Sequence, residues 1–340
     1  MLYFQIMSLD ASELMAACRA ALPGRPGMDI RSINPLPGKQ HTLVAFHLID
    51  GEARTPLILR RYPSPLGWAG PNLPGKARRE FEMLRWLRGR DLLSPEAVGL
   101  GRDASGDWLL ERAISGRHWW LPLGSVNFNR ALPGLVRQMV RLLGRLHSLE
   151  LDDLPTEAAL VPTITVRGVI QTWHAALRRS GDRHVVEAIE RISGLMSTVQ
   201  ERPPRLLHLN VEMENVLVDE AQQIVGWLDW DQVALGDPRW DVALLVDSLY
   251  GAYALPDLAR WAVTDYGRET VRPVKDIRLW AALIAVLRWA QCSWLAEQVR
   301  RRRKLSFPSS ARFLDSYGSQ RAWAMQLLNE AERAKDDTTG

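Results

Sequence analysis

The chain has 340 residues, which is long enough for one large two-lobed domain or two ordinary ones, each with its own core. Its 46% hydrophobic and 24% charged residues are typical of a soluble globular protein, and its two cysteines exclude a disulfide framework and indicate a reducing compartment, the cytoplasm. The net charge of +4 is dispersed, so we expect no nucleic-acid partner, and no apolar run approaches the length of a membrane span.

The N-terminal third has the pattern of a small α+β lobe. Residues 1–6 look like the remains of a protease-cleavable expression tag, so the lobe is taken as residues 7–113. Ser8 or Asp10 can cap a first helix that ends near Leu22, before Pro23-Gly24. The other expected elements are strands at 41–49 and 56–62, a helix at 76–88, and two strands on either side of residues 103–106.

From residue 114 to residue 340 the pattern is mainly helical and predicts a second, larger lobe. Two short apolar runs, at 206–218 and 223–230, interrupt the helices and are predicted to form a hairpin that carries polar loops. The expected helices lie at 132–149, 165–180, 183–200, 239–251, 255–267, 275–303 and 309–333.

Polar residues stand at the ends of these two apolar runs. Asn215 and Asp229 each end or follow a run, so each side chain is expected to be held rigidly and to face a cleft. Amide and carboxylate oxygens are the ligands that Mg²⁺ prefers. Further on, Gly236-Asp237-Pro238 is predicted to start a helix, with Asp237 as its N-cap and Pro238 as its first residue.

Residues 206–241 resemble the signature of the aminoglycoside phosphotransferase/choline kinase-like family, H-G-D-x-x-x-x-N followed by I-D-W and G-D-P-x-x-D. The three pieces occur in the family's order and at suitable spacing. The resemblance implies an α+β, two-lobed protein kinase-like fold, with an antiparallel sheet in the small N-terminal lobe and a mainly helical C-terminal lobe. Weaker similarities lie at Pro35 to Gly38, Leu57 to Arg60, Arg79 to Phe81, Leu109 to Arg112 and Leu146-His147.

The resemblance also implies ligands and roles. The ligands are ATP or GTP with Mg²⁺ in the N-terminal nucleotide-binding lobe, and a small molecule that accepts a phosphoryl group on a hydroxyl in the C-terminal catalytic and substrate lobe. Taken alone, Arg60 could be a surface strand residue, Glu80 a solvated helix residue and His208 a satisfied core histidine. The resemblance implies that Gly38 belongs to the nucleotide loop, that Arg60 binds the phosphates and that Glu80 orients Arg60. It implies that the backbone of Glu111 and Arg112 contacts the nucleotide base. It also implies that Asn215 and Asp229 bind Mg²⁺ and that His208 supports the catalytic loop.

One position departs from the family pattern, because Asn210 stands where the catalytic aspartate is expected. An amide takes no proton near neutral pH, and loss of a general base typically lowers a rate by ~10²–10⁴-fold. Leu209, Met213 and Glu214 replace a glycine, a proline and a glycine, and leucine does not accept positive φ as glycine does, so we expect a differently shaped loop. Two hypotheses remain: a phosphotransferase in which Asn210 orients the acceptor or Glu212 or Glu214 acts as a displaced base, and a pseudoenzyme that binds nucleotide or another ligand as a sensor or partner.

The acceptor side is less specific. Residues 251–340 contain ten Asp and Glu against fifteen Lys and Arg, which argues against a polycationic acceptor. The basic run 300–304 is expected at a solvated helix C-terminus, with an anionic substrate or partner as the alternative. Most tryptophans here are expected in the core, with one or two lining a pocket for a flat or sugar-like acceptor: Trp261, Trp280, Trp289, Trp294 and Trp323.

Overall fold

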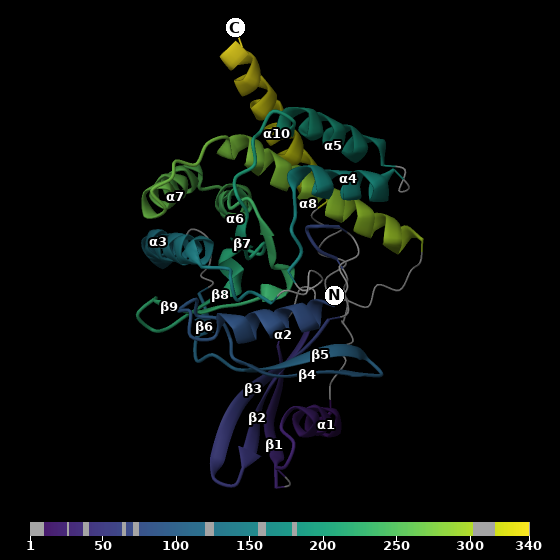
Figure 1. The fold of residues 1–340 in the computed structure, drawn as a ribbon, viewed down its shortest axis with the longest axis vertical. Helices are drawn as coiled ribbons and strands as arrows, with labels where there is room; N and C mark the ends of the chain where they lie inside the picture. The colour runs from purple at the N-terminus through teal and green to yellow at the C-terminus, as the bar shows by residue number, and fades with distance from the viewer. Residues whose placement is uncertain are drawn as a thin grey trace.

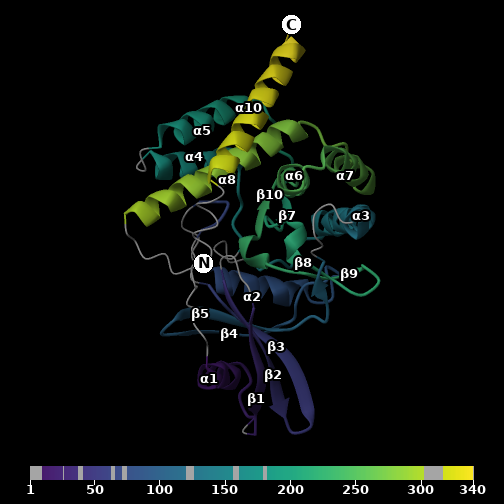
Figure 2. The same ribbon diagram turned by 180° about the vertical axis from the view of Figure 1, so that it is seen from behind.

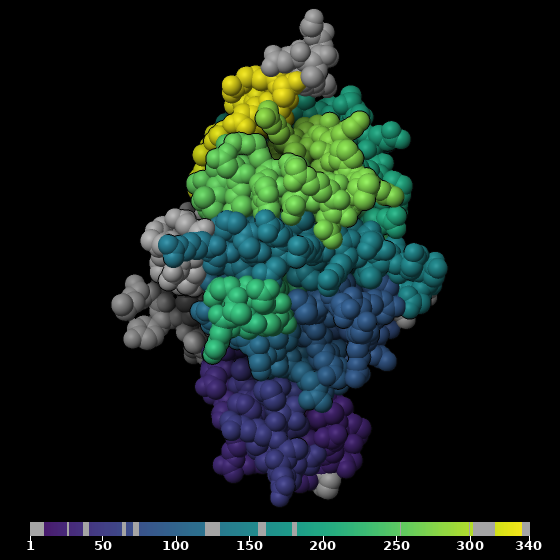
Figure 3. Space-filling view, turned by 90° about the vertical axis from the view of Figure 1, so that its left-hand side faces the viewer, coloured from purple at the N-terminus to yellow at the C-terminus, as the bar shows by residue number. Residues whose placement is uncertain are grey.

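The fold has a sheet-bearing lobe at one end and a helical lobe at the other (Figure 1). In the space-filling view the N-terminal part, purple and blue, forms one end of the molecule and the green and yellow C-terminal helices form the other (Figure 3). Gly38 and the supposed tag, residues 1–6, lie outside the described residues. The computed structural model describes residues 10–25, 27–36, 41–62, 66–70, 75–119, 126–155, 161–178, 182–301 and 317–339.

The small lobe contains a five-stranded antiparallel sheet in the order β1-β2-β3-β5-β4, where β1 is a strand that we did not predict. The helix α1 packs against this sheet, and their apolar faces form a separate core. The elements are α1 (Ala11–Ala21), β1 (Asp29–Leu36), β2 (Thr42–Asp50), β3 (Ala53–Arg61), α2 (Lys76–Leu87), β4 (Ala97–Asp103) and β5 (Gly106–Arg112).

Local chemistry explains where α1 begins. The Asp10 carboxylate accepts the backbone N–H groups of Ser12 and Glu13, both at 2.9 Å, and Glu13 accepts the Asp10 N–H in return. This reciprocal capping box satisfies N–H groups that have no partner inside the helix, and such a cap stabilises a helix by about 1 kcal/mol. Of the two caps that the sequence allowed, the structure therefore uses Asp10.

The larger lobe is mainly helical, as predicted. Its long helix α8 crosses the core with Trp280, Leu283 and Leu287 fully buried, and α10 lies across it (Figure 2). The elements are β6 (Arg117–His118), α3 (Val126–Ser148), α4 (Val166–Leu177), α5 (Arg183–Met196), β7 (Arg205–Leu207), β8 (Val216–Val218), β9 (Ile224–Trp227), β10 (Ala234–Gly236), α6 (Arg239–Asp247), α7 (Pro256–Glu269), α8 (Ile277–Arg300) and α10 (Tyr317–Thr339).

One helix in the described part of the chain is apolar over a longer stretch than our reading of the sequence allowed. The segment Ile277–Gln298 of α8 could cross a membrane by length and composition alone. However, 83% of its most apolar window is buried inside the protein, which is how the core helix of a globular protein also behaves. The segment is therefore weak evidence for a membrane span.

Two expectations about the polar-loop region need correction. The run 206–218 is not one strand, because β7 pairs with β10 whereas β8 pairs with β9 to form the hairpin. The helix α6 begins at Arg239, as in the expected range 239–251, but Pro238 and not Asp237 is the residue that immediately precedes it. Asp237 still caps this turn, because its carboxylate accepts the Arg239 N–H at 2.9 Å.

Candidate functional site

The hairpin β8–β9 brings Asn215 and Asp229 to the same end of two paired strands. Asn215 immediately precedes β8 in a short 3₁₀ turn (Met213–Asn215), and Asp229 follows β9 by two residues. Val216 pairs with Trp227, and the Leu228 N–H donates to the Asn215 carbonyl at 2.8 Å. Asp229 has φ 71°, a left-handed conformation that re-aims its carboxylate after the strand.

Asp229 lies at the centre of a network of donors. Its Oδ1 accepts from Arg60 Nη1 at 2.5 Å and lies 3.4 Å from His41 Nε2, while its Oδ2 accepts from the Asn210 amide. The side chain is 21% exposed, so solvent still reaches it. Burial raises the pKa of Asp229, but the His41 hydrogen bond and the charge of Arg60 outweigh burial and hold this pKa well below its usual range. Asp229 is therefore an anion at every pH of interest.

Arg60 and Glu80 are buried together, which excludes the surface positions that each could have had on its own. Arg60, on β3, is 4% exposed and lies 3.6 Å from Glu80 and 3.8 Å from Glu111. Glu80, on α2, accepts from the Tyr62 hydroxyl at 2.6 Å and from the Trp230 N–H at 3.1 Å. Burial, offset only in part by Arg60, raises the pKa of Glu80 to about 7.

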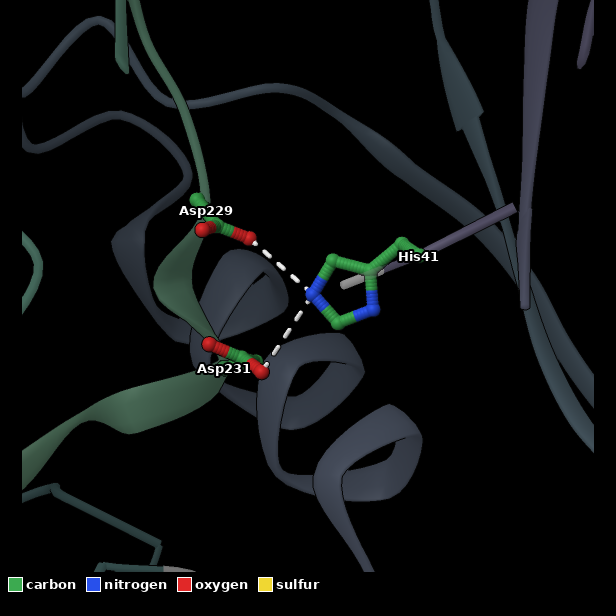
Figure 4. A group of neighbouring side chains, drawn as sticks. All are labelled: His41, Asp229 and Asp231. Carbon is green, nitrogen blue, oxygen red and sulfur yellow. Dashed lines mark ion pairs between the residues drawn. The ribbon is translucent and has the colours of Figure 1, made fainter. Parts of the chain in front are cut away.

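Three residues of this cluster were missed by the sequence analysis. Lys76, the first residue of α2, lies 2.7 Å from Asp231, and His41, just before β2, lies 3.5 Å from Asp231 (Figure 4). All three are at least nine-tenths buried. The sequence held a signal for Asp231, because this residue follows Asp229 by two positions, where an apolar run ends in acidic residues. His41 and Lys76 have no such signal, because their partners lie far away along the chain.

The loop 208–215 is held by His208 and Asp241. Asp241 accepts the backbone N–H groups of His208 and Leu209, both at 2.8 Å. The His208 ring stacks on Trp227 with centroids 4.4 Å apart, and its Nδ1 accepts the Asn210 N–H at 3.1 Å. Burial lowers the pKa of His208 to about 4, so the ring is neutral near pH 7 and can accept this bond. His208 is thus a core histidine that also supports the loop.

The loop conformation corrects our expectation about Leu209. Leu209 has φ 59°, which is the left-handed region that favours glycine, so the backbone takes this conformation without a glycine. Its side chain is 1% exposed, and its N–H is held by Asp241. Buried apolar surface and that bond offset a strain of about 1–2 kcal/mol. The substitution therefore does not prevent this turn.

The three polar residues of the motif are connected to one another. The Asn210 side-chain amide donates to the Asp229 carboxylate. The backbone carbonyl of Asn210 accepts from the Asn215 side-chain amide at 2.9 Å. Asn215 and Asp229 offer an amide oxygen and a carboxylate, which suit Mg²⁺, and Asp231 offers a second carboxylate beside them. The Asp231 Oδ1 atom is buried and has no hydrogen-bond partner among the described residues. This donor set fits a divalent cation.

The backbone that we expected to contact a nucleotide base is less accessible than predicted. Glu111, on β5, is 2% exposed and its carboxylate faces Arg60. The Arg112 N–H already donates to the Glu96 carbonyl at 2.9 Å, and the Arg112 side chain pairs with Glu96 at 2.8 Å. The Ala113 N–H donates to Pro56. A base bound here would therefore have to contact other backbone atoms than the N–H groups of residues 112 and 113.

A pocket of about 210 Å³ opens beside the catalytic loop. Arg288 of α8 pairs there with Asp247 at 2.5 Å and with Glu212 at 2.9 Å, so the Glu212 carboxylate already has a cationic partner. Trp323 donates to Asp247 at 2.9 Å, whereas Trp280 and Trp289 are core residues. The pocket is lined by Glu212, Glu214, Asp247, Ser248, Gly251, Tyr253, Arg288, Ser319, Gln320 and Trp323.

The charge of this pocket differs from the charge of the region around it. The pocket has three carboxylates and one guanidinium, which is the opposite sign from the charge count of residues 251–340. Among the residues that line the pocket, Arg288 is the basic one. That the acceptor is not a polycation stays a prediction.

Comparison with known proteins agrees with the fold. A model of the Phosphotransferase enzyme family matches residues 32–274. A putative aminoglycoside phosphotransferase from Ralstonia eutropha JMP134 is 18% identical, with a TM-score of 0.70 over 96% of this chain and 99% of that chain. A thermostable mutant of the aminoglycoside phosphotransferase APH(4)-Ia, in a ternary complex with AMP-PNP and hygromycin B, is 15% identical, with a TM-score of 0.62 over 92% and 98% of the two chains.

Similarity to a curated protein covers part of a much longer chain. Acyl-CoA dehydrogenase family member 10 from Mus musculus is 26% identical over an alignment of 234 residues that covers 63% of this chain and only 21% of that protein. The solved structures, at under 25% identity, show the fold alone. That fold is the two-lobed, protein kinase-like α+β fold.

Proposed function

Because this chain belongs to the phosphotransferase enzyme family, we propose that it transfers the terminal phosphoryl group of ATP or GTP to a hydroxyl of a small molecule. The observation that carries this proposal is the convergence of Asn210, Asn215 and Asp229 with Arg60 in one partly exposed cluster. An adenine nucleotide is our first choice, since a solved structure with this fold holds AMP-PNP.

Arg60 and Lys76 supply the charge that nucleotide phosphates need. Arg60 can exchange Asp229 for a phosphate oxygen and still keep Glu80 and Glu111 as partners, so the exchange leaves no buried charge unpaired. Asn215 and Asp229 are the residues that would hold Mg²⁺, which supplies charge neutralisation on the phosphates when bound. These residues therefore bind and orient the donor half of the reaction.

The acceptor half depends on Asn210. Phosphoryl transfer passes through a loose transition state, so positioning and charge contribute more than proton removal, and an amide can still orient a hydroxyl. The proton then goes to water or to phosphate, and we expect turnover ~10²–10⁴-fold below that of an aspartate-containing site. The acceptor is a hydroxyl compound that fits the pocket between the catalytic loop, α8 and α10.

A second candidate function is a nucleotide- or ligand-binding pseudoenzyme. The observation that favours it is the direction of the Asn210 amide, which donates to Asp229 instead of lining the acceptor pocket. In that case the cleft binds nucleotide and the protein acts as a sensor or partner. For either function we propose a cytoplasmic location, which the two buried free thiols, Cys18 and Cys292, support.

Thermal unfolding with Mg·ATP and with Mg·GTP tests nucleotide binding, because a ligand present at 100 times its Kd stabilises by ~2.7 kcal/mol. Nucleotide turnover by the natural protein and by Asn210→Asp then separates the two functions. Asn329→Asp on α10 is the matched control, because its oxygen accepts from Arg191 at 2.7 Å and an aspartate is tolerated there. Slow turnover that rises in Asn210→Asp supports the enzyme, binding without turnover in either form supports the pseudoenzyme, and no nucleotide binding refutes both.

A further inference from the structure

His41, Asp229 and Asp231 meet where the small lobe contacts the β8–β9 hairpin. Figure 4 shows the His41 ring, which comes from the segment before β2, pointing its Nε2 atom between the two carboxylates. That atom lies 3.4 Å from Asp229 Oδ1 and 3.5 Å from Asp231 Oδ2. The ligand atoms of the three residues all lie within 4.8 Å of one another.

These distances are longer than those of strong hydrogen bonds. A charge-assisted bond between nitrogen and oxygen measures about 2.7–2.9 Å, so His41 is not closely bonded to either carboxylate. Two ligand atoms on a tetrahedral ion with bonds of about 2.1 Å are about 3.4 Å apart. The spacing of 3.4 Å and 3.5 Å on either side of Nε2 is therefore the spacing of atoms that share a metal ion.

The charges of the cluster also leave room for a cation. Arg60 keeps Glu80 and Glu111 if Asp229 turns to a metal. Lys76 can move from Asp231 Oδ2 to Oδ1, which is buried and has no hydrogen-bond partner among the described residues, while Oδ2 binds the ion. The carboxylates Glu80, Glu111, Asp229 and Asp231 face the permanent cations Arg60, Lys76 and Arg79.

We propose that His41, Asp229 and Asp231 form a site for a divalent first-row transition metal, such as Mn²⁺, Co²⁺ or Zn²⁺, in which His41 supplies a nitrogen ligand. One imidazole with two carboxylates suits these ions, whereas Mg²⁺ takes oxygen ligands and retains its waters. The ion joins the small lobe to the hairpin. This inference rests on the proposed function only in sharing Asp229, because the ion binds to the protein without nucleotide.

Pulsed EPR of the protein with Mn²⁺ alone tests the nitrogen ligand directly. We expect a ¹⁴N coupling on Mn²⁺ that changes to a ¹⁵N coupling when the histidines are labelled with ¹⁵N. This comparison needs no substitution, so it does not depend on the folding of a variant. Absence of any histidine nitrogen coupling on bound Mn²⁺, or absence of Mn²⁺ binding, overturns the proposal.

Two variants then identify the histidine. His41→Gln is expected to abolish the nitrogen coupling and to weaken Mn²⁺ binding by ~10-fold or more, since loss of even an outer partner of a metal ligand weakens binding 10–100-fold. The matched control is His47→Gln on the adjoining strand β2, whose ring contacts Arg54. A coupling that survives in folded His41→Gln overturns the assignment.

A parallel titration with Mg·ATP and Mg·GTP separates this inference from the proposed function. Nucleotide binding without a nitrogen coupling on Mn²⁺ leaves the function standing and refutes the metal site. A His41 nitrogen coupling without nucleotide binding supports the metal site and refutes the function.

Discussion

Replacing Asn210 with aspartate is expected to destabilise the metal-free protein and to tighten its binding of divalent cations. The Asn210 amide donates to the Asp229 carboxylate, so the variant removes one hydrogen bond to a charged group and faces two carboxylates toward each other. The lost bond costs about 1.5–3 kcal/mol. Repulsion between unit charges about 4 Å apart reaches about 4 kcal/mol at an effective dielectric of 20, and Arg60 and solvent at the partly exposed Asp229 reduce it.

We therefore expect Asn210→Asp to lose about 2–4 kcal/mol in the free energy of unfolding at pH 7. The second carboxylate raises the pKa of the new group in the folded state, so the loss is full above that pKa and fades as the pH falls toward 4. Urea unfolding at both pH values, with and without Mg²⁺, measures this. Equal stability of the two proteins at pH 7 without metal, or equal Mg²⁺ affinity, would refute the interpretation of the Asn210–Asp229 contact.

Three further outcomes follow from the buried cluster and the loop. Arg60→Met leaves Glu80, Glu111 and Asp229 without their shared partner, so it should lower the free energy of unfolding by about 3–5 kcal/mol, whereas Arg60→Lys should lose less; urea unfolding compares them. The pKa of Glu80 is raised from 4.5 to about 7 in the folded state, so the free energy of unfolding should fall as the pH rises from 4.5 to 7. Glu80→Gln should reduce this pH dependence in thermal melting, and an unchanged pH dependence would contradict the shift. Asp241→Asn places an amide N–H opposite one of the two backbone N–H groups that Asp241 accepts, so the free energy of unfolding should fall by about 1–3 kcal/mol. Hydrogen exchange should become faster at the backbone amides of His208 and Leu209 and stay unchanged at distant amides.

Local patterns predicted much of the fold. The hairpin strands and the helices have a regular apolar period, and Asn215 and Asp229 were placed correctly at one end of the hairpin because the turn between its two strands is short. The strand β1 was missed, because Pro35 and exposed residues interrupt its alternating pattern. Elements whose pattern is complete in the sequence were thus easier to find than elements that depend on their neighbours.

The site was harder to predict, for physical reasons. His41 and Lys76 acquire their role only from carboxylates more than 150 positions away, and a single sequence has no signal for such pairs. Leu209 was expected to reshape its loop, but two bonds from Asp241 to the loop backbone and burial of its side chain hold the left-handed turn. The charge of the pocket differs from that of residues 251–340, because composition does not tell which side chains face inward.

Calorimetric titration with a non-hydrolysable ATP or GTP analogue, with and without Mg²⁺, tests the central claim most directly. The account predicts saturable binding that requires the divalent ion and is lost in Asp229→Asn, while Asp219→Asn, on the far turn of the same hairpin, binds normally. Absence of binding by the natural protein, or binding that Asp229→Asn leaves unchanged, would contradict it.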